Sequence, residues 1–229
     1  MSQNPIKVIG ICCSPRVNGN TEILVREALA GAKEAGAIAE MITLRDKDIK
    51  GCDGCRGCDK TGKCHIKDDM VAIYPKLIEA DGLIFGTPVY FWSVTGQAKV
   101  FMDRLVCLHR KNLLRNKVGG VIAVASSSGH AGVRDLYYSF FSATKIIIGD
   151  FVQGFSKDKG QIKKDRWAVA ASHELGRKIV GIAQGRMKYP EDYSQSLADM
   201  VKEKYGIASE PMMGRFEAEA PILVHVVKK

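Results

Sequence analysis

Long hydrophobic runs are missing from this sequence of 229 residues. Its apolar stretches fall well short of the roughly 20 residues that a membrane-spanning helix requires, so we expect no transmembrane helix and no membrane partner. The first residues, MSQNPIKVIGICCSPR, have no basic stretch before their apolar run and no small-residue cleavage pattern after it. This argues against a secretory signal, and we expect a cytoplasmic protein.

Two common nucleotide-binding motifs are also absent, namely the P-loop pattern GxxxxGK(S/T) and the dinucleotide fingerprint GxGxxG. The excess of 34 Lys and Arg over 25 Asp and Glu gives a formal charge of +9, but the basic residues are spread along the chain. Their densest stretch, 156–166, lacks the interleaved aromatic residues of single-strand binders, so we expect no nucleic-acid partner. A solvated loop and a docking site for an acidic redox protein are the two interpretations of this stretch.

The hydrophobic pattern alternates between two kinds of segment, as the 46% hydrophobic content of a globular chain allows. Nearly continuous apolar runs, which are typical of strands covered on both faces, occupy 6–13, 38–44, 82–88, 118–126 and 145–150. Helical spacing occupies 20–35, 68–80, 97–108, 134–144 and 166–187, and Pro75 predicts a kink or break near Tyr74. The sequence therefore predicts an α/β fold in which a five-stranded parallel sheet carries helices on both faces.

Three loops follow strands at the edge where such sheets bind ligands. SPRVNGNT (14–21) joins hydroxyls, amides and an arginine to the start of a helix, which suits a phosphate; a capped loop that binds nothing is the alternative. TPVYFWS (87–93) places three aromatic residues where a planar ring would lie. SSSGHAG (126–132) has small residues that let a ligand approach the backbone, and we interpret His130 as an incidental loop residue.

Four of the seven cysteines lie within thirteen residues of the loop 51–65, in the spacing CxxCxxCxxxxxC: Cys52, Cys55, Cys58 and Cys64. In a reducing compartment this favours metal or redox chemistry over disulfides. The two-residue gaps let three thiolates surround one corner of a cuboidal iron-sulfur cluster. Zinc is the alternative, although four-cysteine zinc sites usually place a long spacer between two CxxC pairs. We expect the other three cysteines, Cys12, Cys13 and Cys107, to be core residues.

The segments SPRVNGNT and GTPVYFWS, and the cysteine run followed by IKDDM, closely resemble the flavodoxin-like NADPH-dependent FMN reductase superfamily, specifically its iron-sulfur flavoprotein branch. The similarity covers about residues 5–187. It implies FMN, with its phosphate in the first loop and its ring over the second, and one [4Fe-4S] cluster. The implied FMN residues are Ser14, Arg16, Asn18, Gly19, Asn20, Thr21, Thr87, Pro88, Val89, Tyr90, Phe91, Trp92, Ser126, Ser127 and Gly129. The implied cluster ligands are Cys52, Cys55, Cys58 and Cys64.

The same resemblance implies an FMN-dependent oxidoreductase. Since a cluster passes single electrons and FMN accepts one or two, we expect electrons to pass from an acidic ferredoxin-like donor through the cluster to FMN. A small-molecule acceptor such as O2 or H2O2 would then receive them. Because the cysteine loop follows the second strand, we expect the cluster at the same sheet edge as the flavin. The alternatives are an NAD(P)H-dependent FMN or quinone reductase without a functional cluster, and a zinc-stapled binding domain.

Residues 188–229 are predicted to form an extension beyond the flavodoxin-like domain 1–187. EDYSQSLADMVKEKYG has a helical pattern and APILVHVVKK an apolar strand pattern. An exposed apolar strand promotes aggregation, so we expect the extension to pack against its own domain or a neighbouring subunit. Because the resembling family is oligomeric, we expect a homodimer or homotetramer.

Overall fold

The sheet of the computed structural model, which describes residues 5–185, has five strands. All pairs are parallel and the strand order is β2-β1-β3-β4-β5, which confirms the predicted flavodoxin-like sheet. The strands are β1 (Lys7–Cys12), β2 (Ile38–Thr43), β3 (Gly82–Pro88), β4 (Val118–Ala125) and β5 (Ile147–Phe155). In the described part of the chain, no helix is long and apolar enough to cross a membrane.

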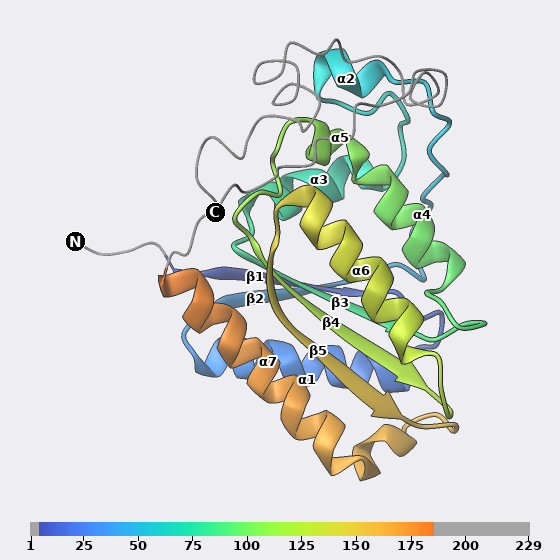
Figure 1. Cartoon of the computed structure of the whole chain (residues 1–229), viewed down its shortest axis with the longest axis vertical. Helices are drawn as coiled ribbons and strands as arrows, with labels where there is room; N and C mark the ends of the chain where they lie inside the picture. The colour runs from blue at the N-terminus through green and yellow to red at the C-terminus, as the bar shows by residue number, and fades with distance from the viewer. Residues whose placement is uncertain (1–4, 186–229) are drawn as a thin grey trace, which may run out of the picture. The chain divides into compact units, whose positions relative to one another are not determined.

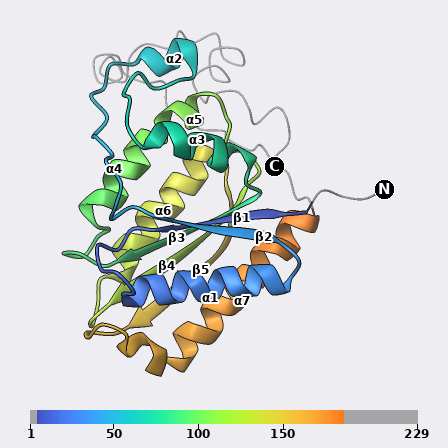
Figure 2. The same cartoon turned by 180° about the vertical axis from the view of Figure 1, so that it is seen from behind.

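Helices cover both faces of this sheet (Figures 1 and 2). One face carries α1 (Asn20–Glu34) and α7 (Arg166–Gly185). The other carries α3 (Met70–Glu79), α4 (Gly96–Arg104), α5 (Val106–Arg110) and α6 (His130–Thr144). Side chains alternate along each strand, so Leu83 and Phe85 enter the core under α3–α6 while Ile84 enters the core under α1 and α7. Both cores are therefore built on the same central strands.

Glycine allows the backbones of α1 and α7 to approach closely. A Cβ atom at Gly176 would lie 1.8 Å from the carbonyl oxygen of Ala28, and one at Gly31 would lie 2.0 Å from that of His173. Both obstacles are backbone atoms, which cannot rotate away. The crossing of the two helices thus depends on the absence of side chains at these positions.

Two helix predictions are corrected by the structure. The predicted helix 97–108 is divided at Leu105, because the carbonyl of Arg104 leaves the helical pattern to accept a hydrogen bond from the Tyr74 hydroxyl at 3.0 Å. The break that Pro75 predicted does not occur, and α3 continues through it. The carbonyl that loses its partner there belongs to Val71, which lies on the exposed side of α3 where water is available.

The fifth strand and His130 also differ from the prediction. Lys145 has a left-handed conformation and ends α6, so β5 begins at Ile147 and extends to Phe155. His130 is not a loop residue but the first residue of α6, 5% exposed, with its Nε2 atom 3.0 Å from the carbonyl oxygen of Gly154. The predicted extension 188–229 lies outside the described residues and stays a prediction.

The glycine crossing predicts that Gly176→Ala lowers the free energy of unfolding by roughly 2–3 kcal/mol, because the added methyl group collides with the α1 backbone. Gly181→Ala, in the same helix, is the matched control, since a Cβ atom there meets nothing within 4 Å. The control should be neutral or slightly more stable than wild type. Urea unfolding of both variants measures this, and equal midpoints would contradict the described crossing.

Candidate functional site

A cavity of about 150 Å³ lies at the carboxyl ends of β1, β3, β4 and β5. Eight of the predicted FMN residues line it: Ser14, Arg16, Asn20, Thr21, Pro88, Val89, Tyr90 and Ser126. The structure thus brings the three predicted loops together around one cavity. The other predicted residues, Asn18, Gly19, Thr87, Phe91, Trp92, Ser127 and Gly129, belong to the same loops but do not line it.

The first loop is folded into a cradle at the start of α1. The Ser14 hydroxyl oxygen accepts a hydrogen bond from the Arg16 amide at 3.2 Å, and Gly19 precedes the first helical residue without providing a capping side chain. A Cβ atom at Gly19 would lie 2.9 Å from the Arg16 Cβ and 3.4 Å from the Ser14 hydroxyl. The first loop therefore packs closely around Gly19 and brings an arginine, a hydroxyl and a positive helix end together, which suits a phosphate.

Asn20 connects this cradle to the loop after β5. Its side-chain amide donates to Ser156 Oγ at 2.9 Å and to the Asp158 carbonyl at 2.8 Å. Its Oδ1 atom accepts from the Gly160 amide at 2.7 Å and the Ile162 amide at 3.4 Å. These four bonds use the full capacity of the side chain, so Asn20 positions the second wall of the cavity. Its direct contact with the phosphate stays a prediction.

Glu22 is a buried anion beneath the first loop. Its carboxylate accepts hydrogen bonds from Arg26 and Arg45, each at 2.7 Å, and from the Asn18 amide at 2.9 Å. Burial opposes ionisation, but the bonds from Arg26, Asn18 and Arg45 outweigh it and hold the pKa of Glu22 below its usual value. The charged carboxylate thus fixes the loop at neutral pH.

The second loop ends in a tight turn that displays two aromatic rings. Tyr90 and Ser93 exchange backbone hydrogen bonds of 2.8 and 3.0 Å, and the residues between them, Phe91 and Trp92, both have positive φ angles, 45° and 61°. Such angles cost non-glycine residues roughly 1–2 kcal/mol each. Phe91 is 94% exposed and Trp92 64% exposed. The fold thus maintains a strained turn to present apolar rings, which is typical of functional loops.

The third loop contacts the second more than it contacts the cavity. Gly129 has a φ angle of 98°, and a Cβ atom there would lie 2.7 Å from Val89 Cγ1 and 3.2 Å from Trp92 Cα. Gly129 therefore supports the aromatic turn from behind, while Ser126 lines the cavity itself.

Four cavity residues were not predicted: Val124 and Ala125 at the end of β4, and Ser156 and Lys157. The last two matter most, because they add a further loop to the cavity. They follow β5 directly, and the Ser156 amide donates to the Ala125 carbonyl at 2.8 Å. The sequence prediction ended the fifth strand at Asp150 and so treated these residues as part of a solvated basic stretch. The apolar and β-branched residues Phe151, Val152 and Phe155 in DFVQGF, which favour a strand, could have extended the predicted strand and revealed them.

The four clustered cysteines line a second cavity of about 150 Å³. Cys52 and Cys55 are exposed, whereas Cys58 and Cys64 are half-buried, and α2 (Gly57–Thr61) carries Cys58. The remaining wall comes from α4 and α5 and includes Cys107, whose thiol donates to the Arg104 carbonyl at 3.4 Å. As predicted, Cys12, Cys13 and Cys107 are buried. The fold thus gathers the four predicted ligands, and only those four of its exposed or half-buried described cysteines, around one space.

A buried ion pair closes the base of the cysteine loop. Arg104 bonds both carboxylate oxygens of Asp68, and neither side chain is exposed. The same guanidinium donates to the Lys50 carbonyl at 2.7 Å, and Asp68 accepts from the Lys50 amide at 2.9 Å. Burial opposes the ionisation of Asp68, but the bonds from Arg104 and from the Lys50 and Met70 amides outweigh it and lower its pKa. Arg104 therefore fastens both ends of the cysteine loop to α4.

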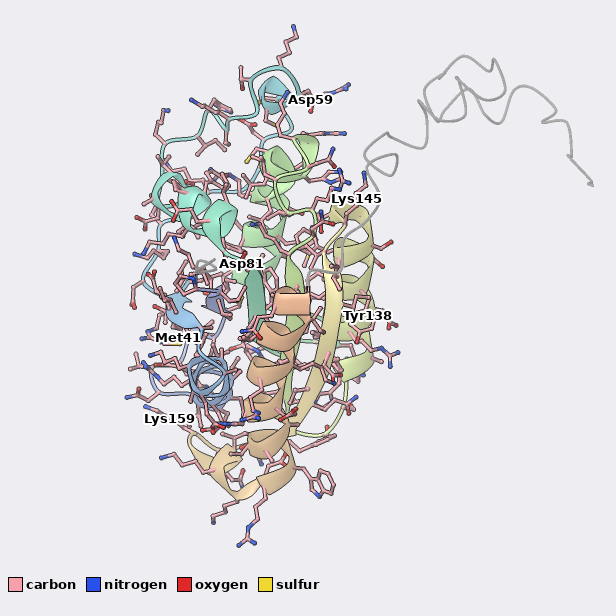
Figure 3. The ribbon with its side chains drawn as sticks, turned by 90° about the vertical axis from the view of Figure 1, so that its left-hand side faces the viewer. Met41, Asp59, Asp81, Tyr138, Lys145 and Lys159 are labelled. Carbon is pink, nitrogen blue, oxygen red and sulfur yellow. The ribbon has the colours of Figure 1, made fainter. Side chains whose placement is uncertain are left out.

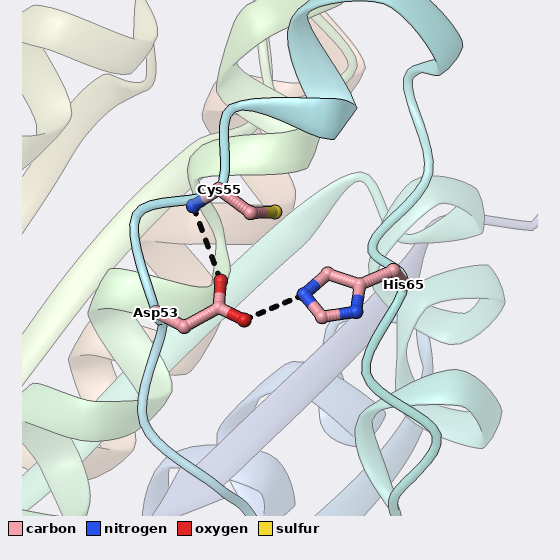
Figure 4. A group of neighbouring side chains, drawn as sticks. All are labelled: Asp53, Cys55 and His65. Atoms are coloured by element: carbon pink, nitrogen blue, oxygen red, sulfur yellow. Dashed lines mark hydrogen bonds and ion pairs between the residues drawn. The ribbon is translucent and has the colours of Figure 1, made fainter.

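A hydrogen bond between two side chains also crosses the loop near its exposed side. Asp53 lies between Cys55 and His65 (Figure 4); it accepts a hydrogen bond from the Cys55 amide at 3.2 Å and lies 2.7 Å from His65 Nε2. Asp53 follows Cys52 in the chain and His65 follows Cys64, so the contact joins the segments that carry the first and last of the four clustered cysteines. Possible ligand atoms of Asp53, Cys55 and His65 all lie within 4.8 Å of one another.

The two cavities lie at opposite ends of α4, which corrects the prediction of a shared sheet edge. Thr95 caps the first turn of α4 and donates its hydroxyl to the Cys13 carbonyl beside the phosphate cradle at 3.0 Å, whereas Arg104 at the last turn lines the cysteine cavity. The nine residues of this helix rise about 13 Å. The loop leaves β2 at the predicted edge but runs beside α4 toward α5 (Figures 1 and 2). Figure 3 accordingly shows Asp59, beside Cys58, far from Lys159 in the loop after β5.

Residues 6–151 match the NADPH-dependent FMN reductase family, and the chain belongs to this family. It is 40% identical over 189 residues to an iron-sulfur flavoprotein of Methanocaldococcus jannaschii, covering 78% of this chain and 98% of that protein. An iron-sulfur flavoprotein of Archaeoglobus fulgidus is 32% identical over 195 residues, and the match covers 78% of this chain and 96% of that protein. The chain is therefore an FMN-dependent oxidoreductase.

Solved structures agree with the fold. RosB, crystallised with 8-demethyl-8-formylriboflavin-5'-phosphate, superposes with a TM-score of 0.72 at 15% identity, covering 98% of this chain and 94% of its own. An NAD(P)H:quinone oxidoreductase from Methanothermobacter marburgensis gives a TM-score of 0.61 at 12% identity, covering 77% and 96%. At such identities the likeness concerns the α/β architecture alone.

The cradle predicts that Gly19→Ala weakens FMN binding at least tenfold, because the methyl group enters the space between Arg16 and Ser14. Gly19 has a φ angle of −77°, which alanine adopts readily, but the Cβ atom would also lie 3.1 Å from the Arg16 carbonyl oxygen, so the loop must shift. Urea unfolding of the apoprotein, measured alongside, shows whether the loss of affinity exceeds any loss of stability. Gly96→Ala is the control, since a Cβ atom there meets nothing within 4 Å. Titration of apoprotein with FMN, followed by flavin fluorescence, measures the affinities; equal affinities would place the phosphate elsewhere.

Proposed function

We propose that this protein is an iron-sulfur flavoprotein that carries single electrons from a ferredoxin-like donor through a [4Fe-4S] cluster to FMN and on to a small acceptor. When bound, FMN can accept electrons singly and deliver them in pairs. Ser14, Arg16 and Lys157 would hold its phosphate, and Val89 and Tyr90 would contact its ring. Two donors, each giving one electron, and two protons would convert O2 to H2O2, or H2O2 to two waters.

The observation that carries the cluster assignment is the single cavity lined by all four clustered cysteines. Four cysteine thiolates are the usual ligands of a [4Fe-4S] cluster, and two-residue gaps between the first three are common among them. Two arginines at the rim of the same cavity, Arg56 and Arg110, share the single Asp59 carboxylate and would offset part of the negative charge of a thiolate-bound cluster. Two relatives that this chain matches over 98% and 96% of their own length are called iron-sulfur flavoproteins, which supports the same assignment.

A single zinc ion is the competing occupant, and the trio of Asp53, Cys55 and His65 offers it three suitable ligand atoms. That arrangement would use one of the four clustered thiols. The existing hydrogen bond between Asp53 and His65 already satisfies two of the trio without a metal. The cavity as a whole therefore favours the cluster over zinc.

If the four thiols are the ligands, Cys64→Ser should abolish iron and acid-labile sulfide in anaerobically purified protein and leave FMN bound. Cys107→Ser is the matched control, because Cys107 lines the same cavity while its thiol bonds a backbone carbonyl. The control should keep its iron and sulfide. Retention of a full cluster in Cys64→Ser, or its loss in Cys107→Ser alone, would overturn the ligand assignment.

The donor is testable by stopped-flow reduction of the holoprotein. We expect reduced acidic ferredoxin to reduce the protein faster than NADPH does, and the formal charge of +9 predicts that the rate falls as salt is raised. Faster reduction by NADPH would favour the alternative, an NAD(P)H-dependent FMN or quinone reductase. If the rate of reduction by ferredoxin does not change with salt concentration, electrostatic steering of the donor is contradicted.

A further inference from the structure

The three arginines that line the cysteine cavity differ in how their Nε atoms are used. The Nε atoms of Arg56 and Arg110 both bond the Asp59 carboxylate at 3.0 Å, and both side chains are substantially exposed. Arg104 is 1% exposed and is among the largest fully buried side chains of the described residues. Its Nε atom is buried and has no hydrogen-bond partner among those residues.

The remaining nitrogens of Arg104 are occupied. One terminal nitrogen bonds Asp68 and the Lys50 carbonyl, and the other bonds Asp68 at 3.1 Å. A buried N–H group without an acceptor costs roughly 1–3 kcal/mol, so folded proteins rarely leave one unpaired. The described residues supply no acceptor for the Arg104 Nε–H group, although they bond both terminal nitrogens of the same guanidinium. The missing acceptor is therefore expected among the groups that the cavity binds.

We propose that the Nε–H group of Arg104 donates a hydrogen bond to a sulfur atom of the bound cluster and thereby raises the reduction potential of that cluster. This inference rests on the proposed function, since it requires a cluster in the cavity. Hydrogen bonds to cluster sulfurs are among the factors that set such potentials. An N–H donor favours the more negative, reduced state, so its removal lowers the potential.

Because Asp68 neutralises Arg104, the expected change in reduction potential comes from the hydrogen bond and not from the arginine's charge. Its carboxylate forms a two-bond pair with the guanidinium, so the pair contributes no net charge beneath the cavity. A purely structural role for Arg104 would change stability and leave the potential alone. A role as a directed donor changes the potential even when the loop stays closed.

The double substitution R104Q/D68N separates the two roles, because it replaces the buried ion pair with two neutral amides that can bond each other and the Lys50 backbone. No unpaired charge is left in the interior. We expect FMN content and urea midpoint near those of wild type. At a fixed electrode potential near the midpoint, the ratio of reduced to oxidised cluster should fall about tenfold, which is 59 mV for a one-electron couple.

R110K is the matched control, because it keeps the positive charge beside the same cavity and removes an Nε–H group that is already paired with Asp59. It should change the ratio less than threefold. Redox titration followed by electron paramagnetic resonance of the reduced cluster measures all three proteins. An unchanged potential in R104Q/D68N, or an equal shift in R110K, would overturn the inference and leave the cluster assignment standing.

A second measurement does not depend on the variant folding. Wild-type holoprotein labelled with 15N-arginine should show hyperfine coupling of a guanidinium nitrogen to the reduced cluster in pulsed resonance experiments, and R110K should retain it. Absence of the coupling in a wild-type protein that carries a cluster would contradict the hydrogen bond. Absence of any cluster in anaerobic wild-type protein would instead overturn the proposed function, and the inference with it.

Discussion

The buried ion pair between Arg104 and Asp68 is the interaction on which the arrangement of the cysteines depends. The loop between Lys50 and Asp68 has one short helix and is exposed over most of its length, so its own packing cannot fix its shape. Its ends are held because one guanidinium bonds the Lys50 carbonyl and the Asp68 carboxylate together. A buried pair of this kind tolerates no loss of a single partner, since the other charge would remain in the interior.

Helix α4 connects this buried ion pair, at one of its ends, to the phosphate cradle at the other. Its first turn is bound to the end of β1 through Thr95 and Gln97, which both donate to the Cys13 carbonyl. Its last turn carries Arg104. One rigid element therefore fixes the separation of the phosphate cradle and the cysteine cavity. The two cavities are separate, because the residues that line one do not line the other.

The sheet and the cores were predictable because buried parallel strands leave continuous apolar runs, and β3 was predicted at its observed bounds. The three loops at the strand ends were predictable for the same reason, since strand ends define their place. The division of the helix at Leu105 was not, because it depends on the distant Tyr74 hydroxyl. Nor was the position of the cysteine cavity, which is set by the contact of Arg104 with residues 36 and 54 positions away. Sequence periodicity carries no information about such pairs.

The cysteine cavity of this FMN-dependent oxidoreductase is proposed to hold an iron-sulfur cluster. Measuring iron, acid-labile sulfide and FMN in wild-type protein purified without oxygen, together with its visible spectrum, tests this proposal. We expect about four iron atoms and four sulfides per FMN, with broad absorption beneath the flavin bands. Protein with stoichiometric FMN and no iron, or with one zinc ion in place of iron, would contradict it.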